Sequence, residues 1–466
     1  MLLFVIVSAP GALKMDMEKL QRKITFRLYP STSQEALMEE TLALHCRVYN
    51  ALLEEHQRRF ETKEPAFNFS SMCKALTEWR TRSDSLKSLN AQSLQVTAKR
   101  VALAFDAFFR RVKAGEEPGY PRFKPIQRFA GWGYKTYGDG WKLHQQDGRH
   151  GQVRLSGIGL VPMRGQGRFS GTPKTSEVIH KSGKWYLSVT YTVSSEAIAH
   201  KRGSEVAAFD WGLTTLLTLA KADGTMSEVD NPRWLKARLA QIKTLQRVIS
   251  EAETQAKALA GIAEDEPMKK GQRFPVTARL KRLYAQLRAI HAKVSRQRYD
   301  FYHQLTKRMV EQFAFLGTEE LSVKNMTRRP KKKMDEAGTA LPNGAAQKAG
   351  LNRSILDAAP SLLLGMLRTK AEEAGSVFAE ANTRVVKPTQ RCHRCGTLVK
   401  KDLSERSHRC SCGCACGRDE NAAKTLLRWM LEGHSWFAPG TGAAGSRIAA
   451  ILSLEAPTIA TAPAGV

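Results

Sequence analysis

The sequence predicts a multidomain α+β protein built in two parts, and three observations lead to this fold class. Strand-like patterns at 23–30 and 128–197 flank a helical stretch at 31–117. Beyond residue 198, apolar strands alternate with long amphipathic helices. Six cysteines then lie within about two dozen residues near the C-terminal end. A chain of 466 residues is long enough for about two to four domains.

The first part reads as a small β-structure interrupted by helices. "KITFRLYP" (23–30) is a strand that proline ends, and Thr32 and Glu35 then fit a capping box at the start of a helix. "NAQSLQVTAKRVALAFDAFFRRV" has the apolar spacing of a second amphipathic helix. The basic, aromatic turn "GYPRFKP" precedes a run of strands such as "KWYLSVTYTV".

The second part begins with "EVAAFDWGLTTLLTLAKADG", which reads as two tightly joined strands. Asn231 and Pro232 fit the N-cap and first position of a helix, and a second long helix follows after a loop at 262–276. These helices are expected to be antiparallel. "FAFLGTEEL" and "SVFAEA" read as strands on either side of the helix "LLLGMLRTKAEEAG", and 327–348 is expected to be a mobile loop.

The charge of the chain indicates a polyanionic partner. Its formal net charge is +29 at pH 7, and the basic residues are spread along most of the sequence. Neutralising phosphates releases counterions, so this excess favours nucleic acid over a merely basic surface. No apolar run approaches the ~18 residues of a spanning helix. The apolar opening "MLLFVIVSAPGAL" lacks a basic leader region, so it is a poor signal peptide, and Met15 or Met17 are alternative starts.

The cysteine segment predicts a structural zinc site. Cys392-x-x-Cys395 and Cys410-Ser-Cys412 each have glycine directly behind them, which lets the backbone turn around the metal. Cys414 and Cys416 continue the same alternation, so spacing alone does not select two of the last four cysteines. The glycine after Cys412 favours the first pair. Four thiolates leave no open position, and His393 and His408 are interpreted as bystanders.

Three carboxylates lie at the ends of predicted elements. Asp210 and Glu319 follow apolar strands, and Asp419 begins the helix "ENAAKTLLRWML". Singly, they read as a turn residue, a surface acid and a helix N-cap. Together, in a chain that binds nucleic acid, they suit a site for two Mg²⁺ ions about 4 Å apart that hydrolyses a phosphodiester.

Residues 23–430 resemble the TnpB family, the OrfB-type proteins of small insertion sequences and relatives of compact type V CRISPR effectors. The resemblance rests on ordered motifs along the chain. They are "KITFRLYP", "YNALLEE", "GYPRFKP", "AAFDWGLTTLLTLAKADG", "NPRWL", "EELSVKNM", "LNRSILDA", the paired cysteine knuckles and "RDENAAKTL".

The resemblance implies a wedge-like N-terminal β-barrel with a helical recognition insert. It further implies a C-terminal RNase H-like RuvC nuclease domain that contains an inserted four-cysteine zinc ribbon. The implied limits are an N-terminal extension, expected to be disordered, at 1–22, barrel segments at 23–30 and 118–197, the insert at 31–117, nuclease segments at 198–386 and 417–432, the ribbon at 387–416 and a disordered tail at 433–466.

The family's function is RNA-guided cutting of double-stranded DNA beside a short flanking motif. By resemblance, Asp210, Glu319 and Asp419 are the catalytic Mg²⁺ ligands, and Cys392, Cys395, Cys410 and Cys412 hold one Zn²⁺. Two positions depart from the family pattern. Gly417 stands where the family has the first Asp of "D-R-D", and Cys414 and Cys416 fall in a variable spacer, where they could permit alternative zinc ligation or oxidation.

The expected partners are a guide RNA from the element end and target double-stranded DNA, with no membrane. The protein is expected to be cytoplasmic and nucleoid-associated, as a monomer or a homodimer. The alternatives are a nuclease-inactive RNA-guided DNA-binding protein, a compact CRISPR effector, or a transposase. Weak candidates for nucleic-acid contacts, for which solvated helix faces are the competing interpretation, are Tyr49, Gln92, Gln95, Lys99, Arg122 and Lys124.

Overall fold

The computed structural model describes residues 20–147, 150–165, 171–194, 201–263, 272, 274–336, 340–402 and 404–433. Residues 1–19 of the expected extension and 434–466 of the expected tail lie outside these ranges. Residues 20–22 belong to a strand, so the disorder expected through residue 22 is wrong for these three residues. The chain divides into two compact units, Met1–Ile198 and Ala199–Val466. No helix in the described ranges is both long enough and apolar enough to cross a membrane.

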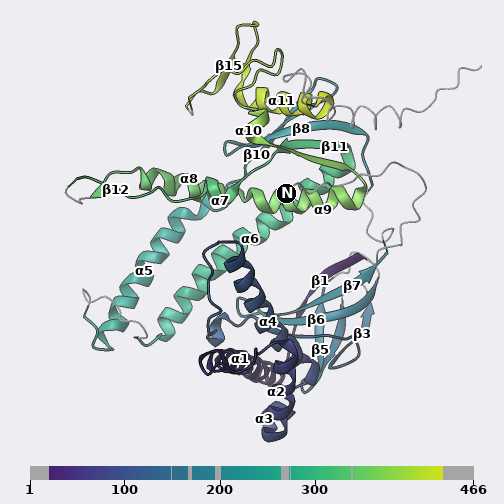
Figure 1. The fold of residues 1–466 in the computed structure, drawn as a ribbon, viewed down its shortest axis with the longest axis vertical. Coiled ribbons are helices and arrows are strands. Elements are labelled where there is room, and N and C mark those ends of the chain that lie inside the picture. Colours follow the sequence, from purple (N-terminus) through teal and green to yellow (C-terminus); the bar gives the residue numbers. More distant parts are fainter. Residues whose placement is uncertain are drawn as a thin grey trace, which may run out of the picture. The chain divides into compact units, whose positions relative to one another are not determined.

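The first unit is an antiparallel barrel with helices inserted after its first strand. Its sheet has the order β2-β6-β7-β1-β5-β4-β3 and curves into a nearly closed barrel (Figure 1). The strands are β1 (Leu20–Leu28), β2 (Gly131–Tyr134), β3 (Trp141–Asp147), β4 (His150–Leu155), β5 (Gly159–Arg164), β6 (Thr172–His180) and β7 (Trp185–Val193). Ile24, Phe26 and Leu28 alternate along β1 into the barrel core.

Four helices form the insertion: α1 (Thr32–Glu61), α2 (Phe69–Arg82), α3 (Asp84–Lys87) and α4 (Ala91–Lys113). The predicted capping box of α1 is displaced by one residue. The Ser31 side chain accepts from the Gln34 backbone N–H, and the Gln34 side chain accepts from the Ser31 N–H. Thr32 therefore begins the helix, and Glu35 accepts a hydrogen bond from Trp185 Nε1 at 3.2 Å.

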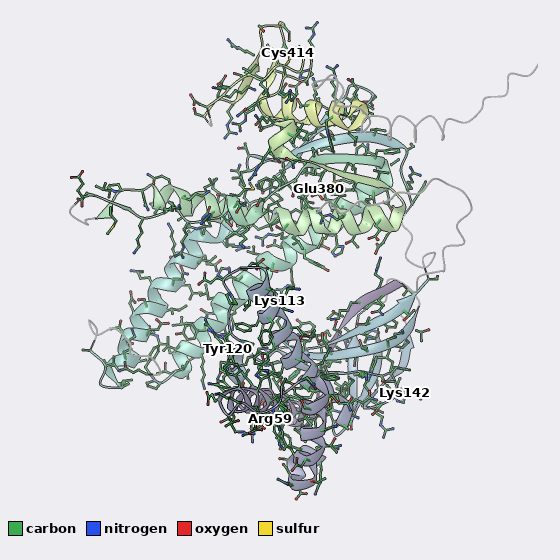
Figure 2. The ribbon with its side chains drawn as sticks, in the orientation of Figure 1. Arg59, Lys113, Tyr120, Lys142, Glu380 and Cys414 are labelled. Carbon is green, nitrogen blue, oxygen red and sulfur yellow. The ribbon has the colours of Figure 1, made fainter. Side chains whose placement is uncertain are left out.

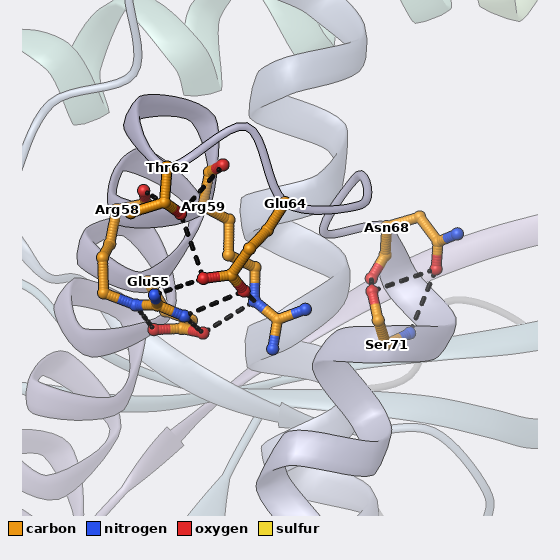
Figure 3. Close-up of polar contacts among 7 residues, drawn as sticks. All are labelled: Glu55, Arg58, Arg59, Thr62, Glu64, Asn68 and Ser71. Atoms are coloured by element: carbon orange, nitrogen blue, oxygen red, sulfur yellow. Dashed lines mark hydrogen bonds and ion pairs between the residues drawn. The ribbon is translucent and has the colours of Figure 1, made fainter.

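Charged and polar side chains secure the junction between α1 and α2 (Figure 3). Arg58 pairs with Glu55 at 2.9 Å and with Glu64 at 2.5 Å, which ties the last turns of α1 to the loop that follows. Asn68 then caps α2 by accepting from the Ser71 N–H at 3.0 Å. These contacts fix where α1 ends and α2 begins.

The second unit contains a five-stranded sheet of order β10-β9-β8-β11-β14. Its strands are β8 (Glu205–Trp211), β9 (Thr215–Lys221), β10 (Met226–Asp230), β11 (Phe313–Glu319) and β14 (Val377–Ala381). The first three in that order are antiparallel, and β11 runs parallel to both β8 and β14.

Helices cover both faces of this sheet (Figure 1). The sheet contacts α6 (Ala278–Gln312), α9 (Pro360–Ala374) and α11 (Arg418–Glu432). The other helices of this unit are α5 (Leu239–Ala258), α7 (Val323–Met326), α8 (Ala345–Ala358) and α10 (Thr383–Val386). Phe209 and Leu316 pack on one face in a cluster with residues of α6 and α9. Ala208 and Phe315 belong to clusters with residues of α11. Alternate residues of each strand thus face α11.

The predicted helix start at Asn231 is wrong. Arg233 has φ of 49°, a left-handed conformation that a helix cannot pass through, and α5 begins only at Leu239 after a short 3₁₀ turn at Lys236–Arg238. The Asn231 side chain instead donates to the Leu213 carbonyl at 2.9 Å. The carboxylate of Asp357, more than a hundred residues later, accepts from the N–H groups of Leu235 and Lys236.

The expectation of a mobile loop at 327–348 is also incorrect for its described residues. A short antiparallel hairpin pairs β12 (Lys333–Met334) with β13 (Ala340–Leu341), and α8 already begins at Ala345. The tight pair of strands, the two long antiparallel helices α5 and α6, and the strands β11 and β14 occur where the sequence predicts them.

Candidate functional site

The sheet of the second unit places Asp210 and Glu319 on one face. Asp210 is two residues after Ala208, which packs against α11. Glu319 is two residues after Gly317, which lies so close to α11 that an added Cβ would be 3.0 Å from Met430 Sδ. Residues two apart on a strand share a face, so both carboxylates lie on the face that α11 covers. The parallel register pairs Gly317 with Ala208. Continuing that register sets Glu319 beside Asp210 on adjacent strands.

Asp419 reaches the same neighbourhood on α11. Gly417 is the N-cap of this helix and makes no side-chain cap, so Asp419 lies in the first turn and the alternative interpretation as an N-cap is wrong. Arg418 Nε donates to Asp419 Oδ1 at 3.4 Å. The side chain of Asp419 remains one-third exposed. It is therefore more accessible than Asp210, which is 5% exposed.

The three carboxylates interact electrostatically. Burial raises the pKa of Asp210 well above its usual range, and the nearby charges of Glu319 and Asp419 raise it further while Arg418 opposes them. Burial also raises the pKa of Glu319 to about 7, against a hydrogen bond from the Thr383 side chain. Neighbouring carboxylates repel one another when they are ionised. A bound divalent cation would stabilise their ionised forms.

The ligand atoms of the three carboxylates do not all lie within 4.8 Å of one another. Among the described residues, the groups whose ligand atoms all lie within 4.8 Å of one another consist of cysteines and histidines. No group of three carboxylates in those ranges meets that spacing. Asp210, Glu319 and Asp419 are nevertheless near enough for the charges of Glu319 and Asp419 to act on Asp210.

The four cysteines predicted to bind zinc do come together. Cys392, Cys395, Cys410 and Cys412 form one of the 4.8 Å groups, with Sγ–Sγ distances of 3.7 Å for Cys392–Cys412 and 3.5 Å for Cys395–Cys410. Gly396 and Gly413 have φ of 80° and 81°, the left-handed turns that glycine permits behind each knuckle. This donor set fits a tetrahedral Zn²⁺.

A buried asparagine joins the cysteine segment to α11. Asn421 Nδ2 donates to the carbonyls of Pro388 at 3.2 Å and Arg391 at 2.7 Å, and its Oδ1 accepts from the His393 N–H at 3.1 Å. Thr425 also donates to the Arg391 carbonyl, at 3.0 Å. Sequence reasoning missed this role of Asn421, although its place in "RDENAA" two residues after Asp419 was the available signal.

The candidate nucleic-acid residues of the first unit differ in accessibility. Arg122 and Lys99 are exposed, whereas Gln92 and Gln95 are half-buried. Tyr49 is only 2% exposed, and Lys124 Nζ lies 4.3 Å from the centre of its ring. Asn50 holds the Lys124 backbone through hydrogen bonds of 2.9 and 3.0 Å. Tyr49 is thus a core residue that supports this basic loop.

A basic cavity in the second unit was not predicted from the sequence. It has a volume of about 770 Å³ between α6, the segment after α7, and α8. Its cationic lining residues are Arg298, Arg329, Lys348 and Arg353. Arg298 pairs with Asp357, and Lys348 donates to the Met326 carbonyl. Arg329 and Arg353 are exposed, and neither has an acceptor within the described ranges.

Family models match three segments in order along the chain. They are a helix-turn-helix domain of OrfB_IS605 at residues 17–64, OrfB_IS605, described as "Probable transposase", at 188–329, and the Cas12f1-like TNB domain at 361–426. A protein of Escherichia coli (strain K12), "Putative RNA-guided DNA endonuclease InsQ", is 27% identical over 432 residues, which cover 91% of this chain and 95% of that protein. Together these matches support a TnpB-type protein.

Further comparisons agree with this TnpB-type assignment. A protein of Streptomyces pristinaespiralis, "Putative RNA-guided DNA endonuclease", is 26% identical over 88% of this chain and 90% of its own length. The chain in the "Cryo-EM structure of the Cas12f1-sgRNA-target DNA complex" has a TM-score of 0.54 at 11% identity, covering 88% of this chain and 98% of that one. The TnpB-type chain thus shares the fold of that effector.

Proposed function

We propose that this TnpB-type protein is an RNA-guided endonuclease that cuts double-stranded DNA beside a short flanking motif. The observation that carries the proposal is the placement of Asp210 and Glu319 on one face of the sheet, within electrostatic reach of Asp419 from α11. Two relatives over nearly the whole chain are named as RNA-guided DNA endonucleases. The relatives suggest the endonuclease activity through their names. The three carboxylates are residues of the type that hold the metal ions of such a nuclease.

The second unit is, in this proposal, an RNase H-like RuvC nuclease domain with a single cutting site. Asp210, Glu319 and Asp419 are its catalytic residues. Two Mg²⁺ ions, when bound, would activate a water molecule and stabilise the leaving oxygen. Asp210 and Glu319 would hold their ligand positions rigidly because both belong to paired strands. Asp419 lies on the first turn of a helix and is partly exposed, and in this proposal it would face the substrate.

The cysteine segment is proposed to be a structural zinc ribbon. Cys392, Cys395, Cys410 and Cys412 would hold one Zn²⁺ with no open position for substrate. Asn421 and Thr425 attach this segment to α11. The zinc would therefore support the placement of Asp419 without taking part in the reaction.

Guide RNA and target DNA would occupy basic surfaces of the chain. In RNA-guided recognition, base pairing reads the sequence while the protein holds the backbone, which requires broad positive charge. The net charge of +29, the loop of Arg122 and Lys124, and the cavity with Arg329 and Arg353 suit that task. The barrel and its helical insert would then serve as the wedge and the recognition domain, where Lys99, Gln92 and Gln95 remain candidates.

The proposal is tested with the protein purified together with RNA from its own locus. The complex is mixed in Mg²⁺ with a plasmid library that carries randomised sequence beside the target. We expect cleavage of a subset that shares one flanking motif. Asp210→Asn and Glu319→Gln should each lose at least about a thousandfold in cleavage rate, equivalent to about 4 kcal/mol, and still bind target.

Glu320→Gln is the matched control, because Glu320 neighbours Glu319 but is exposed. It should cleave as the unmodified protein does. Binding of target without cleavage by the unmodified protein would overturn the nuclease assignment and favour an RNA-guided DNA-binding protein. Equal loss in Glu320→Gln and Glu319→Gln would overturn the assignment of Glu319.

A further inference from the structure

Two cysteines of the C-terminal segment lie outside the four that form the proposed zinc ribbon. Cys414 is buried, and Figure 2 labels it beside the hairpin of β15 (Ser407–Arg409) and β16 (Ala415–Gly417). Cys416 lies in β16, which leads directly into α11. Cys414 belongs to two further groups with ligand atoms within 4.8 Å: one with Cys392 and His408, the other with His393 and Cys416.

The ring nitrogens of the two histidines distinguish these groups. His408 Nδ1 lies 2.5 Å from Nζ of Lys401, whose ammonium group donates to it. The ring hydrogen of neutral His408 is thereby placed on Nε2, which is buried and has no hydrogen-bond partner within the described ranges. Neither nitrogen of His408 then offers a lone pair to a metal, and Cys392 already belongs to the four-cysteine group.

His393 has the opposite arrangement. Its Nδ1 lies 3.0 Å from Oδ1 of Asn421. That atom of Asn421 must be the acceptor oxygen, because the amide nitrogen donates to the carbonyls of Pro388 and Arg391. Nδ1, 3.7 Å from Cys414 Sγ, therefore carries the hydrogen, and Nε2, 4.0 Å from the same sulfur, keeps its lone pair. Metal-binding histidines are usually oriented by such a bond from their other ring nitrogen.

We propose that His393 Nε2, Cys414 Sγ and Cys416 Sγ bind a second divalent ion of the zinc class, separate from the ion of the four-cysteine group. Two thiolates and an imidazole suit Zn²⁺, and the fourth position is open to water. Asn421, fully buried, orients the histidine. The site goes beyond the proposed nuclease function, since it needs neither guide RNA nor target.

The second ion would connect the ribbon to the helix that carries Asp419. Cys416 is three residues before Asp419, and Asn421 is two residues after it. His393, in contrast, lies in the first cysteine knuckle, between Cys392 and Cys395. Binding at His393, Cys414 and Cys416 therefore joins the knuckle to the segment that enters α11. Occupancy of this site should tighten the start of that helix.

Zinc content of the full-length chain tests the proposal. The protein is reloaded with Zn²⁺ alone, freed of excess metal by gel filtration and analysed for zinc per chain, with circular dichroism as the check on folding. We expect two ions in the unmodified protein and one in His393→Gln and Cys416→Ser. His393→Cys replaces an imidazole with a thiolate, which also binds Zn²⁺, and should retain two ions, as should the control His408→Gln.

Replacement of zinc by Co²⁺ gives a second readout that does not depend on cleavage. The visible absorption should contain a four-sulfur component and a component from two sulfurs and one nitrogen, and only the second should disappear in His393→Gln. Cys412→Ser should instead remove the four-sulfur component. A single ion in the unmodified protein overturns the second site. Loss of one ion in His408→Gln but not in His393→Gln equally overturns it.

Discussion

The hydroxyl group of Thr318 donates a 3.0 Å hydrogen bond to the carbonyl oxygen of Phe209. Thr318 is fully buried, and each of the two residues immediately precedes a proposed metal ligand, Glu319 in one case and Asp210 in the other. A side chain thus reinforces the pairing of β8 and β11 at the point where the carboxylates emerge. The bond links the register of the sheet to the geometry of the site.

Thr318→Val removes this hydroxyl while it preserves the branched shape of the side chain. The Phe209 carbonyl then loses a buried partner, so we expect the free energy of unfolding to fall by about 1–3 kcal/mol. Cleavage should fall at least tenfold if the carboxylates shift. Urea unfolding and cleavage rates measure the two effects. Thr318→Ser keeps the donor and should retain most of the cleavage rate; an equal loss in both variants would contradict the role of the hydrogen bond.

The raised pKa of Glu319 predicts a pH-dependent stability without metal. A carboxyl group with a pKa of about 7 in the folded state, and 4.5 without its surroundings, binds more protons when folded. Unfolding free energy should therefore decrease as pH rises through that window, by up to about 1.4 kcal/mol per pH unit. Calorimetry of metal-free protein, compared with Glu319→Gln, isolates this contribution. Mg²⁺ should reduce the decrease, and an identical slope in both proteins would refute it.

Asp357 predicts a large effect on the free energy of unfolding. It pairs with Arg298 at 2.8 Å and accepts from the N–H groups of Leu235 and Lys236, and its side chain is 7% exposed. Asp357→Asn should lower the unfolding free energy by about 3 kcal/mol, because Arg298 then keeps a poorly compensated charge. Combining it with Arg298→Met should cost less than the sum of the single changes. Strict additivity in urea unfolding would exclude the coupling.

Asn421→Ala tests the attachment of the ribbon to α11. The change leaves the carbonyls of Pro388 and Arg391 without this donor, and the expected cost is about 2–4 kcal/mol in unfolding free energy. Hydrogen exchange should increase at the start of α11. Lys424→Ala, on the same helix and paired with Glu420 on the surface, is the control and should change stability by less than about 1 kcal/mol. Unchanged exchange at the start of α11 would argue against the attachment.

Arg122 predicts a salt-dependent contact with the guide RNA. If this exposed residue neutralises one phosphate, Arg122→Ala should reduce the slope of log affinity against log salt concentration by about 1. Filter-binding titrations at several salt concentrations measure that slope. Arg82→Ala removes a cation that is exposed on α2 but paired with Glu78, and its slope should be unchanged. Equal slopes for the unmodified protein and Arg122→Ala would remove Arg122 from the contact surface.

Much of the second unit could be predicted from local patterns. Apolar runs that end in Asp210 and Glu319 identify β8 and β11, because a buried strand needs continuous apolar residues. The cysteine knuckles can likewise be predicted from residues that are close together in the sequence. The convergence of the carboxylates is different, since it depends on which face each residue takes and on the packing of α11 against that face.

The failures share a physical cause, which is a partner distant in sequence. Asn231 is a residue type that often caps a helix. The N–H group of Leu235, just before the 3₁₀ turn that leads into α5, instead donates to the carboxylate of Asp357 in α8. Tyr49 is a weak candidate for a nucleic-acid contact in the sequence, yet it lies in the core under Lys124.

The central position of β1 has a consequence for synthesis on the ribosome. This strand is made first, but both of its neighbours, β5 and β7, lie more than a hundred residues later in the chain. At translation rates of about 5–20 residues per second, β1 waits for roughly 10–30 s before its partners emerge. Its basic residues, Arg22, Lys23 and Arg27, keep the unpaired strand charged during this interval, which disfavours pairing between nascent chains.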